Sequence, residues 1–179
     1  MALGATIYKV CLTVANMDRH YYNQHSLTLA QHPSETNERL MVRLLAFALY
    51  ADEALAFGRG ISKDDPALWI KDRTGAVDLC IEIGLPRAKV ILKACGSSKQ
   101  VVLLLYGTGA DLWWKNNHEA FSKKNNLTVI QLPCKDTQSM AAIAGRNMDL
   151  TYNIEDGQTT LISGEKVLCI KPVTRQSTL

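Results

Sequence analysis

The sequence lacks the features that mark a zinc, disulfide or membrane protein. Its five cysteines include no CxxC pair and its four histidines add no zinc-ligand spacing, so we expect reduced thiols. No apolar run reaches the roughly 18 residues that a membrane helix requires. The start of the chain has no basic segment followed by an apolar one, so we expect a soluble, unexported protein of the cytoplasm, without a membrane partner.

The sequence also lacks a strong excess of one charge and a phosphate-binding loop. Twenty Lys and Arg against 17 Asp and Glu leave a net charge of +3, which permits nucleic acid as a partner but predicts no dedicated basic face. Gly107-Thr108-Gly109 lacks the further glycines and the GK[ST] ending of a phosphate loop, so it indicates only a strand-to-helix turn.

The length and patterning predict one α/β (α+β) domain over residues 1–179, a mixed β-sheet flanked by helices. Alternating and helical periodicities place the elements along the chain. We expect an N-terminal hairpin over 5–31, a helix from Ser34 to about Asp52, a central hairpin over 64–86, a helix from Pro86, a central strand over 101–106, a helix over about 110–124 with Leu112, Trp113 and Phe121 buried, a strand over 127–132, a short helix from Asp136 to Gly145, C-terminal antiparallel strands over 148–171 and a loose end from Pro172.

The second strand of the central hairpin carries acids on one face. Its period of two places Val77, Leu79, Ile81 and Ile83 on one side and Asp78, Cys80 and Glu82 on the other. A turn over 72–75 would place Asp65 opposite Glu82 and Ala67 opposite Cys80, within reach of one shared cation. Acids on such a strand can also simply solvate an exposed face, so both interpretations stay open.

Glu38 extends the apolar stripe of the first predicted helix by one turn. Met41, Leu44, Leu45 and Ala48 follow the spacing of a core-facing helix side, and the same stripe continued backwards reaches Glu38. An acid aimed inward is functional, is paired with an arginine such as Arg43 or Arg73, or only helps the helix to start.

Several motifs occur together in one order along the chain. They are the opening Met-Ala-Leu-x-Ala-Thr-Ile-Tyr-Lys, His32-Pro33-Ser34-Glu35-Thr36-x-Glu38-Arg39, Pro66-x-x-Trp69, Glu82-Ile83-Gly84-Leu85-Pro86, Lys93-Ala94-Cys95 and Trp113-Trp114. In this order and spacing, nearly end to end, the sequence resembles the bacterial YaeQ family.

This resemblance implies a variant PD-(D/E)XK nuclease-like core of αββαβ order over about residues 34–106. Such cores place acids and a lysine around Mg²⁺, and here Glu38 and Glu82 match two of the acids. Ala67 stands where the aspartate of the motif would follow Pro66, so Asp65 or Asp78 would have to serve as that acid. Gly84 stands where the lysine of the motif would follow Glu82. Lys93, or Lys89 as second choice, would replace that lysine. The candidate metal ligands are therefore Glu82, Asp78, Asp65 and Glu38, with Glu38 and Lys93 catalytic.

Three functions are consistent with these residues. The first is Mg²⁺-dependent hydrolysis of a phosphodiester, in which carboxylates hold the ion and a lysine stabilises negative charge. The second is a non-catalytic module that binds nucleic acid or a protein of the transcription machinery on the same fold. The third is a purely structural role, with Glu38 paired to Arg73 and no metal.

Overall fold

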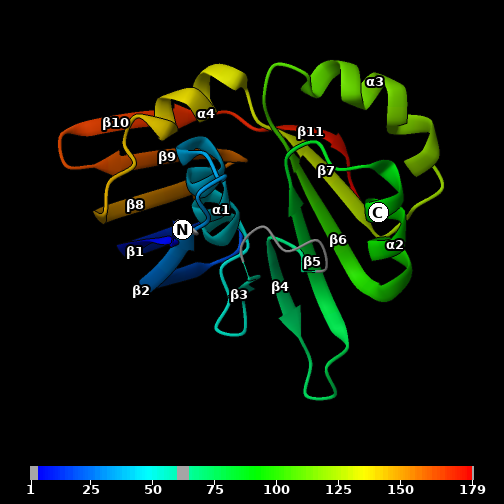
Figure 1. Ribbon diagram of the computed structural model, residues 1–179, viewed down its shortest axis with the longest axis horizontal. Coiled ribbons are helices and arrows are strands. Elements are labelled where there is room, and N and C mark those ends of the chain that lie inside the picture. The colour runs from blue at the N-terminus through cyan, green and yellow to red at the C-terminus, as the bar shows by residue number, and fades with distance from the viewer. Residues whose placement is uncertain (1–3, 60–64, 179) are drawn as a thin grey trace. The chain divides into compact units, whose positions relative to one another are not determined.

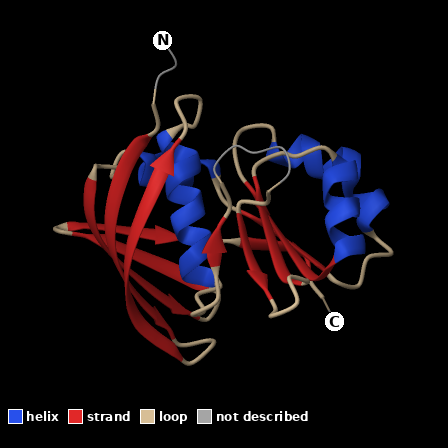
Figure 2. Ribbon diagram, turned by 60° about the horizontal axis from the view of Figure 1, so that its bottom comes forward, coloured by secondary structure: helices blue, strands red, loops and turns tan. Residues whose placement is uncertain are grey.

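The computed structural model describes residues 4–59 and 65–178, so the predicted start of the central hairpin at Asp64 lies outside the described residues. The chain has a mixed α+β fold, and its contacts group it into two compact units. One comprises the chain up to Ala51 together with Lys135–Pro172, and the other comprises Asp52–Cys134 and the segment from Val173. Each unit contains one sheet (Figures 1 and 2), so the expectation of a single sheet was wrong, whereas the expectation of a single domain stays a prediction.

The first unit is built on a five-stranded sheet. In spatial order the strands are β10 (Lys166–Ile170), β9 (Gln158–Ser163), β8 (Asn147–Glu155), β1 (Thr6–Asn16) and β2 (Tyr21–Gln31). β1 and β2 form the N-terminal hairpin that the alternating pattern predicts, and β8–β10 form the C-terminal meander. β1 joins them by running parallel to β8, a pairing of distant segments that periodicity does not reveal.

Helix α1 (Asn37–Leu49) covers one face of this sheet (Figure 2). The face that α1 covers includes the buried side chains of Val10, Leu12 and Val14. The helix begins three residues later than predicted, because Thr36 is its N-cap and accepts a hydrogen bond from the Arg39 N–H at 3.1 Å. Ser34, where the helix was expected to begin, instead lies with its Oγ 2.6 Å from His32 Nδ1.

Glu35, which precedes α1, forms a buried ion pair with a residue of that helix. Arg43 Nε lies 3.0 Å from Glu35 Oε1, and both side chains are almost fully buried. Burial raises the pKa of Glu35 and lowers the pKa of Arg43, so each charged form is destabilised by desolvation that the partner charge only partly offsets.

Replacing one residue of this ion pair should therefore destabilise the folded protein more than replacing both. We expect Glu35→Gln to lower the free energy of unfolding by about 3–5 kcal/mol, because the buried Arg43 charge loses this partner. Arg43→Met should have a smaller effect, because Arg39 Nε still lies 3.8 Å from Glu35 Oε1. The double variant Glu35→Leu with Arg43→Met should recover most of that loss in urea titrations. Asp111→Asn breaks an ion pair whose carboxylate is exposed, and should cost no more than about 1 kcal/mol. A double variant as unstable as the sum of the single ones would contradict this account.

The second unit is built on a six-stranded sheet. In spatial order the strands are β11 (Val173–Gln176), β7 (Leu127–Gln131), β6 (Ser98–Leu105), β5 (Val77–Ile83), β4 (Leu68–Lys71) and β3 (Ala56–Phe57). β5, β6 and β7 are parallel, and β6 lies inside the sheet as its continuous apolar run predicts. The end of the chain was expected to be loose from Pro172, but Val173–Gln176 form β11, which pairs with β7.

Helices α2 (Ala88–Ser97) and α3 (Ala110–Phe121) share one hydrophobic cluster with this sheet. Ile91 of α2 and Phe121 of α3 are buried in it together with Cys80 and Leu103 of the sheet. Leu112 was expected to be buried but is 63% exposed. The fourth helix, α4 (Cys134–Ala141), is shorter than predicted, and within residues 4–59 and 65–178 no helix is long and apolar enough to span a membrane.

Candidate functional site

The turn of the central hairpin lies where the sequence predicts it. Asp72 Oδ1 accepts hydrogen bonds from the Thr74 N–H at 2.8 Å, the Thr74 hydroxyl at 2.6 Å and the Ala76 N–H at 3.0 Å. These bonds lower the pKa of the Asp72 carboxyl. Gly75 follows with φ of 89°, a conformation that favours glycine. The turn therefore fixes where β4 and β5 begin to pair.

The predicted strand register was wrong by two residues. Trp69, not Ala67, pairs with Cys80, and Leu68 pairs with Ile81. The register shifts between Ile70 and Lys71, where β5 contains a residue, Asp78, without a partner on β4. Asp65 therefore does not lie directly opposite Glu82. The strand register gives no reason to expect that the two acids share a cation.

Asp78 forms an ion pair outside the pocket. Its Oδ1 binds the Lys99 ammonium, and this hydrogen bond raises the pKa of Lys99. Asp78 is also absent from the residues that line the neighbouring pocket. Of the two candidates for the motif aspartate, the structure therefore brings only Asp65 to that pocket.

A pocket of about 520 Å³ lies between the sheet of the second unit and α2. Asp65 and Glu82 line it from the chain around β4 and β5, and Lys89 and Lys93 line it from α2. The structure thus gathers two predicted acids and both predicted lysines at one place. The remaining lining is mainly small or apolar, with one aromatic residue: Pro66, Trp69, Val77, Cys80, Val90, Ala94, Ser97 and Ser98.

The Asp65 carboxylate lies close to a positively charged side chain, that of Arg59. Arg59 Nε lies 3.5 Å from Asp65 Oδ2, and the Arg59 N–H donates to the same oxygen at 3.4 Å. The Asp65 side chain is 13% exposed, whereas that of Arg59 is 90% exposed. An ion pair with such an exposed guanidinium contributes about 0–1 kcal/mol, so a metal ion could displace Arg59 at little cost.

Cys80 lies two residues before Glu82 on the same face of β5 and also lines the pocket. Burial, aided by the negative charge of Glu82, raises the pKa of its thiol to about 12. Because only the thiolate is a strong nucleophile, Cys80 is inert at neutral pH. Its role in the pocket is that of a small apolar residue.

The raised pKa of Cys80 predicts a loss of stability at alkaline pH. The unfolded thiol ionises near pH 9 while the folded thiol stays protonated to about 12, so the stabilisation is present below pH 9 and is lost as pH rises from 9 to 12. Between pH 7 and 10 the wild type should therefore lose about 1.4 kcal/mol more than Cys80→Ser, which has no ionisable thiol. Urea titrations at the two pH values measure this difference. Parallel losses in both proteins would contradict the assignment.

Glu38 belongs to the first unit, where it accepts a hydrogen bond from the Thr137 hydroxyl at 2.7 Å. Its predicted alternative partner Arg43 binds Glu35 instead. The side chain is half-buried, as an acid on the edge of a core-facing stripe would be. That Glu38 and Glu82 hold one metal ion together, as the resemblance implies, stays a prediction.

Within residues 4–59 and 65–178, no cluster of three or more His, Cys, Asp or Glu side chains could hold a metal ion. Of the predicted acids, Asp65 and Glu82 are the two that line one pocket, and they remain the candidate cation ligands. Mg²⁺ commonly takes only one or two carboxylates and completes its shell with water and substrate phosphates, so a pair is a sufficient donor set.

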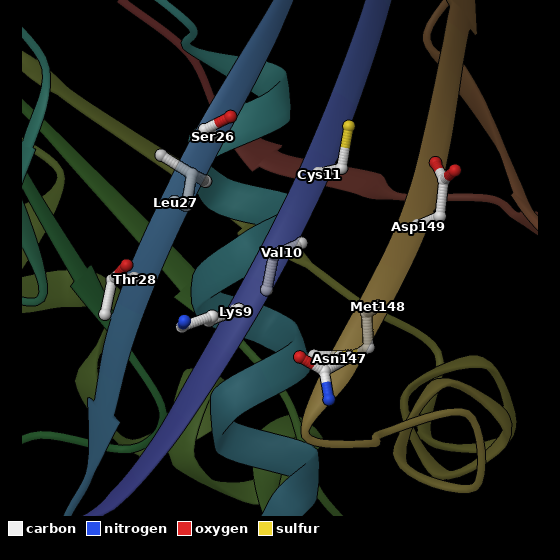
Figure 3. A pocket seen from close by; sticks show the side chains of 9 residues that line it. All are labelled: Lys9, Val10, Cys11, Ser26, Leu27, Thr28, Asn147, Met148 and Asp149. Carbon is white, nitrogen blue, oxygen red and sulfur yellow. The ribbon is translucent and has the colours of Figure 1, made fainter.

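A second hollow, of about 570 Å³, lies on the sheet of the first unit (Figure 3). Cys11 of β1 pairs with Ser26 of β2 and with Asp149 of β8, and all three line the hollow. Lys9 and Asp149 are the charged residues among its described lining. Sequence alternation places these side chains on one face but does not predict a hollow. With a single acid and a single lysine, it is a weaker candidate for phosphate chemistry.

Comparison with known proteins identifies the family. A family model described as "YaeQ protein" matches residues 1–172. The chain belongs to the YaeQ family. It is 45% identical over 159 residues to the uncharacterised YaeQ protein of Escherichia coli K12, and 43% identical to that of Salmonella typhi, each match covering 88% of both chains.

Two solved YaeQ structures have the same fold. The protein from Xanthomonas axonopodis pv. citri superposes with a TM-score of 0.94 at 44% identity, covering 97% of this chain and 99% of that one. The protein from Pseudomonas syringae gives a TM-score of 0.92 at 31% identity, covering 97% of each chain. The family resemblance seen in the sequence motifs is thus confirmed, whereas the relatives' names carry no activity.

Proposed function

We propose that the pocket between β5 and α2 binds Mg²⁺ and that the protein hydrolyses a phosphodiester bond of nucleic acid. The observation that supports this is the gathering of Asp65, Glu82, Lys89 and Lys93 around one pocket. Acids that hold a metal and lysines that stabilise a phosphate are the groups such a reaction needs. They are also the groups that the resemblance to PD-(D/E)XK nucleases assigns to this part of the chain.

In this proposal each side chain of the pocket has a role. Asp65 and Glu82 hold the ion, which when bound supplies positive charge at the phosphate and lowers the pKa of a bound water. Lys93, with Lys89 as second choice, binds the phosphate oxygens and stabilises the negative charge that develops on them. The resemblance assigns Glu38 to the same site as a further acid, but the proposal does not depend on this residue.

One observation favours a different function, a non-catalytic module that binds nucleic acid or a protein of the transcription machinery. Arg59 lies against Asp65, one of the two acids that the metal would need. If Arg59 remains there when a partner binds, the lysines can still hold a phosphate but the pocket has no complete metal site.

Magnesium should stabilise the protein through Asp65 and Glu82. A cation that binds only the folded state raises the free energy of unfolding by about 2.7 kcal/mol at 100 times its dissociation constant. We expect the melting temperature of the wild type to rise with millimolar Mg²⁺, and that of Glu82→Gln and Asp65→Asn to rise less. Asp78→Asn is the matched control, because Asp78 lies outside the pocket and should keep the full response. A wild-type melt that Mg²⁺ leaves unchanged would favour the non-catalytic module.

Hydrolysis should depend on the lysines of α2. With mixed single- and double-stranded DNA and RNA as substrates, we expect Mg²⁺-dependent cleavage that Glu82→Gln abolishes and that Lys93→Met lowers by about 100-fold or more, equivalent to the loss of one charge-stabilising group. Lys89→Met should have the smaller effect. Lys99→Met serves as the control, because Lys99 binds Asp78 outside the pocket. Full activity in Lys93→Met would remove that lysine from the mechanism.

A further inference from the structure

Trp69 is the aromatic residue of the pocket. It lies on β4 directly across from Cys80 and, like Cys80, lines the pocket that holds Glu82. Among the described residues that line this pocket, no other is aromatic. The acids and the lysines account for a metal ion and a phosphate, but neither of these needs an indole ring.

Lys71 determines which surface of the ring a ligand can use. Its ammonium lies 3.4 Å from the centroid of the Trp69 ring, a close cation–π contact that covers one face. A flat ligand would therefore have to stack on the opposite face. The contact also holds the indole in place, so that less side-chain freedom is lost when a ligand binds.

The other tryptophans are not available for this role. Trp113 Nε1 donates to the Pro86 carbonyl at 2.9 Å, and the Trp113 ring stacks on Phe121 with centroids 5.8 Å apart. Trp114 also stacks on Phe121, at 6.5 Å, and packs against the hydrophobic cluster. Both rings are thus used in packing against the hydrophobic core.

The size of the pocket limits what can reach Trp69. Pockets of roughly 300–1,000 Å³ enclose ligands of the size of a drug, which is also the size of one nucleotide. The pocket, at about 520 Å³, falls in this range. A base inside a duplex has both faces covered by its neighbours, whereas a base in a single strand can be splayed out and stacked on an aromatic side chain.

We propose that the substrate class is single-stranded nucleic acid, one base of which stacks on Trp69 while its phosphate faces Lys89 and Lys93. This inference rests on the proposed function for the choice of nucleic acid as the ligand. It adds the structural feature that is recognised, an unpaired base, and the residue that recognises it. It gives no preference among bases, because every base offers a flat face to the ring.

A binding measurement in EDTA tests the inference without hydrolysis. The probes are a fluorescently labelled oligothymidylate of about ten nucleotides, within the usual length of single-strand sites, and the same strand in a duplex with oligoadenylate. We expect fluorescence anisotropy to show tighter binding of the single strand. Trp69→Leu should weaken that binding by about 5- to 150-fold, as expected for one lost stack, whereas Trp69→Phe should stay within a few fold of the wild type. Trp114→Phe is the control and should bind like the wild type.

A second measurement uses the wild-type protein, in case Trp69→Leu does not fold. The chain has three tryptophans, so its NMR spectrum contains three indole N–H signals, and the Trp69→Phe variant identifies the one from Trp69. Titration with the unlabelled single strand should shift that signal more than the other two. A Trp69 signal that stays in place while the strand binds would overturn the proposal.

The outcomes separate this inference from the proposed hydrolysis. Binding that depends on Trp69 without any cleavage in Mg²⁺ supports the inference and argues against catalysis. Cleavage in Mg²⁺ with equal binding by wild type and Trp69→Leu supports catalysis and overturns the inference. Equal affinity for duplex and single strand, or no binding of the single strand, also overturns it.

Discussion

The short connection between β5 and α2 determines what the pocket can contain. Gly84 follows Glu82 by two residues and has φ of 95°, and its N–H donates to the Leu104 carbonyl at 2.9 Å. Lysine is strained in that left-handed conformation, so the lysine of the nuclease motif cannot stand here without a different turn. The same turn brings α2 back over the sheet, where Ile91 packs beside Cys80. The positive φ at Gly84 and the return of α2, which carries Lys89 and Lys93, thus belong to the same short connection.

The bulge in β5 decides which acids share the pocket. A period of two correctly assigns Cys80 and Glu82 to one face, but the extra residue at Asp78 breaks the alternation. Val77 consequently lines the pocket with Cys80, while Asp78 binds Lys99. The sequence contains no signal for the bulge, because Asp78 fits a regular strand as well as Glu82 does. This is why Asp65 and Asp78 could not be ranked before the fold was known.

Local patterns predicted the elements, and contacts between distant segments caused the errors. The alternation in β1, β2 and β8–β10 indicates strands but not partners, so the parallel pairing of β1 with β8 and the division into two sheets were not predictable. The first residue of α1 was also not predictable from the local sequence. Ser34 and Thr36 are both good cap residues, and the buried pair of Glu35 with Arg43 keeps Glu35 outside the helix. The sequence predicted acids and lysines for this site. It did not predict that Trp69 lines the pocket, which became apparent only from the pairing of Trp69 with Cys80.

The charges of the pocket would couple the two proposed ligands, a cation and a phosphate. Asp65 and Glu82 carry two negative charges, and Lys89 and Lys93 carry two positive ones, so without a cation the lysines are partly neutralised by the acids. A divalent ion at the acids cancels their charge and leaves both lysines to attract a phosphate. By reciprocity, a phosphate held by the lysines must raise the affinity of the acids for the cation to the same degree. Arg59 can substitute for the ion at Asp65, but its exposed side chain offers only a weak, exchangeable charge. The proposed cation and nucleotide would therefore strengthen each other's binding, and the proposed stacking on Trp69 would add affinity that depends on neither charge.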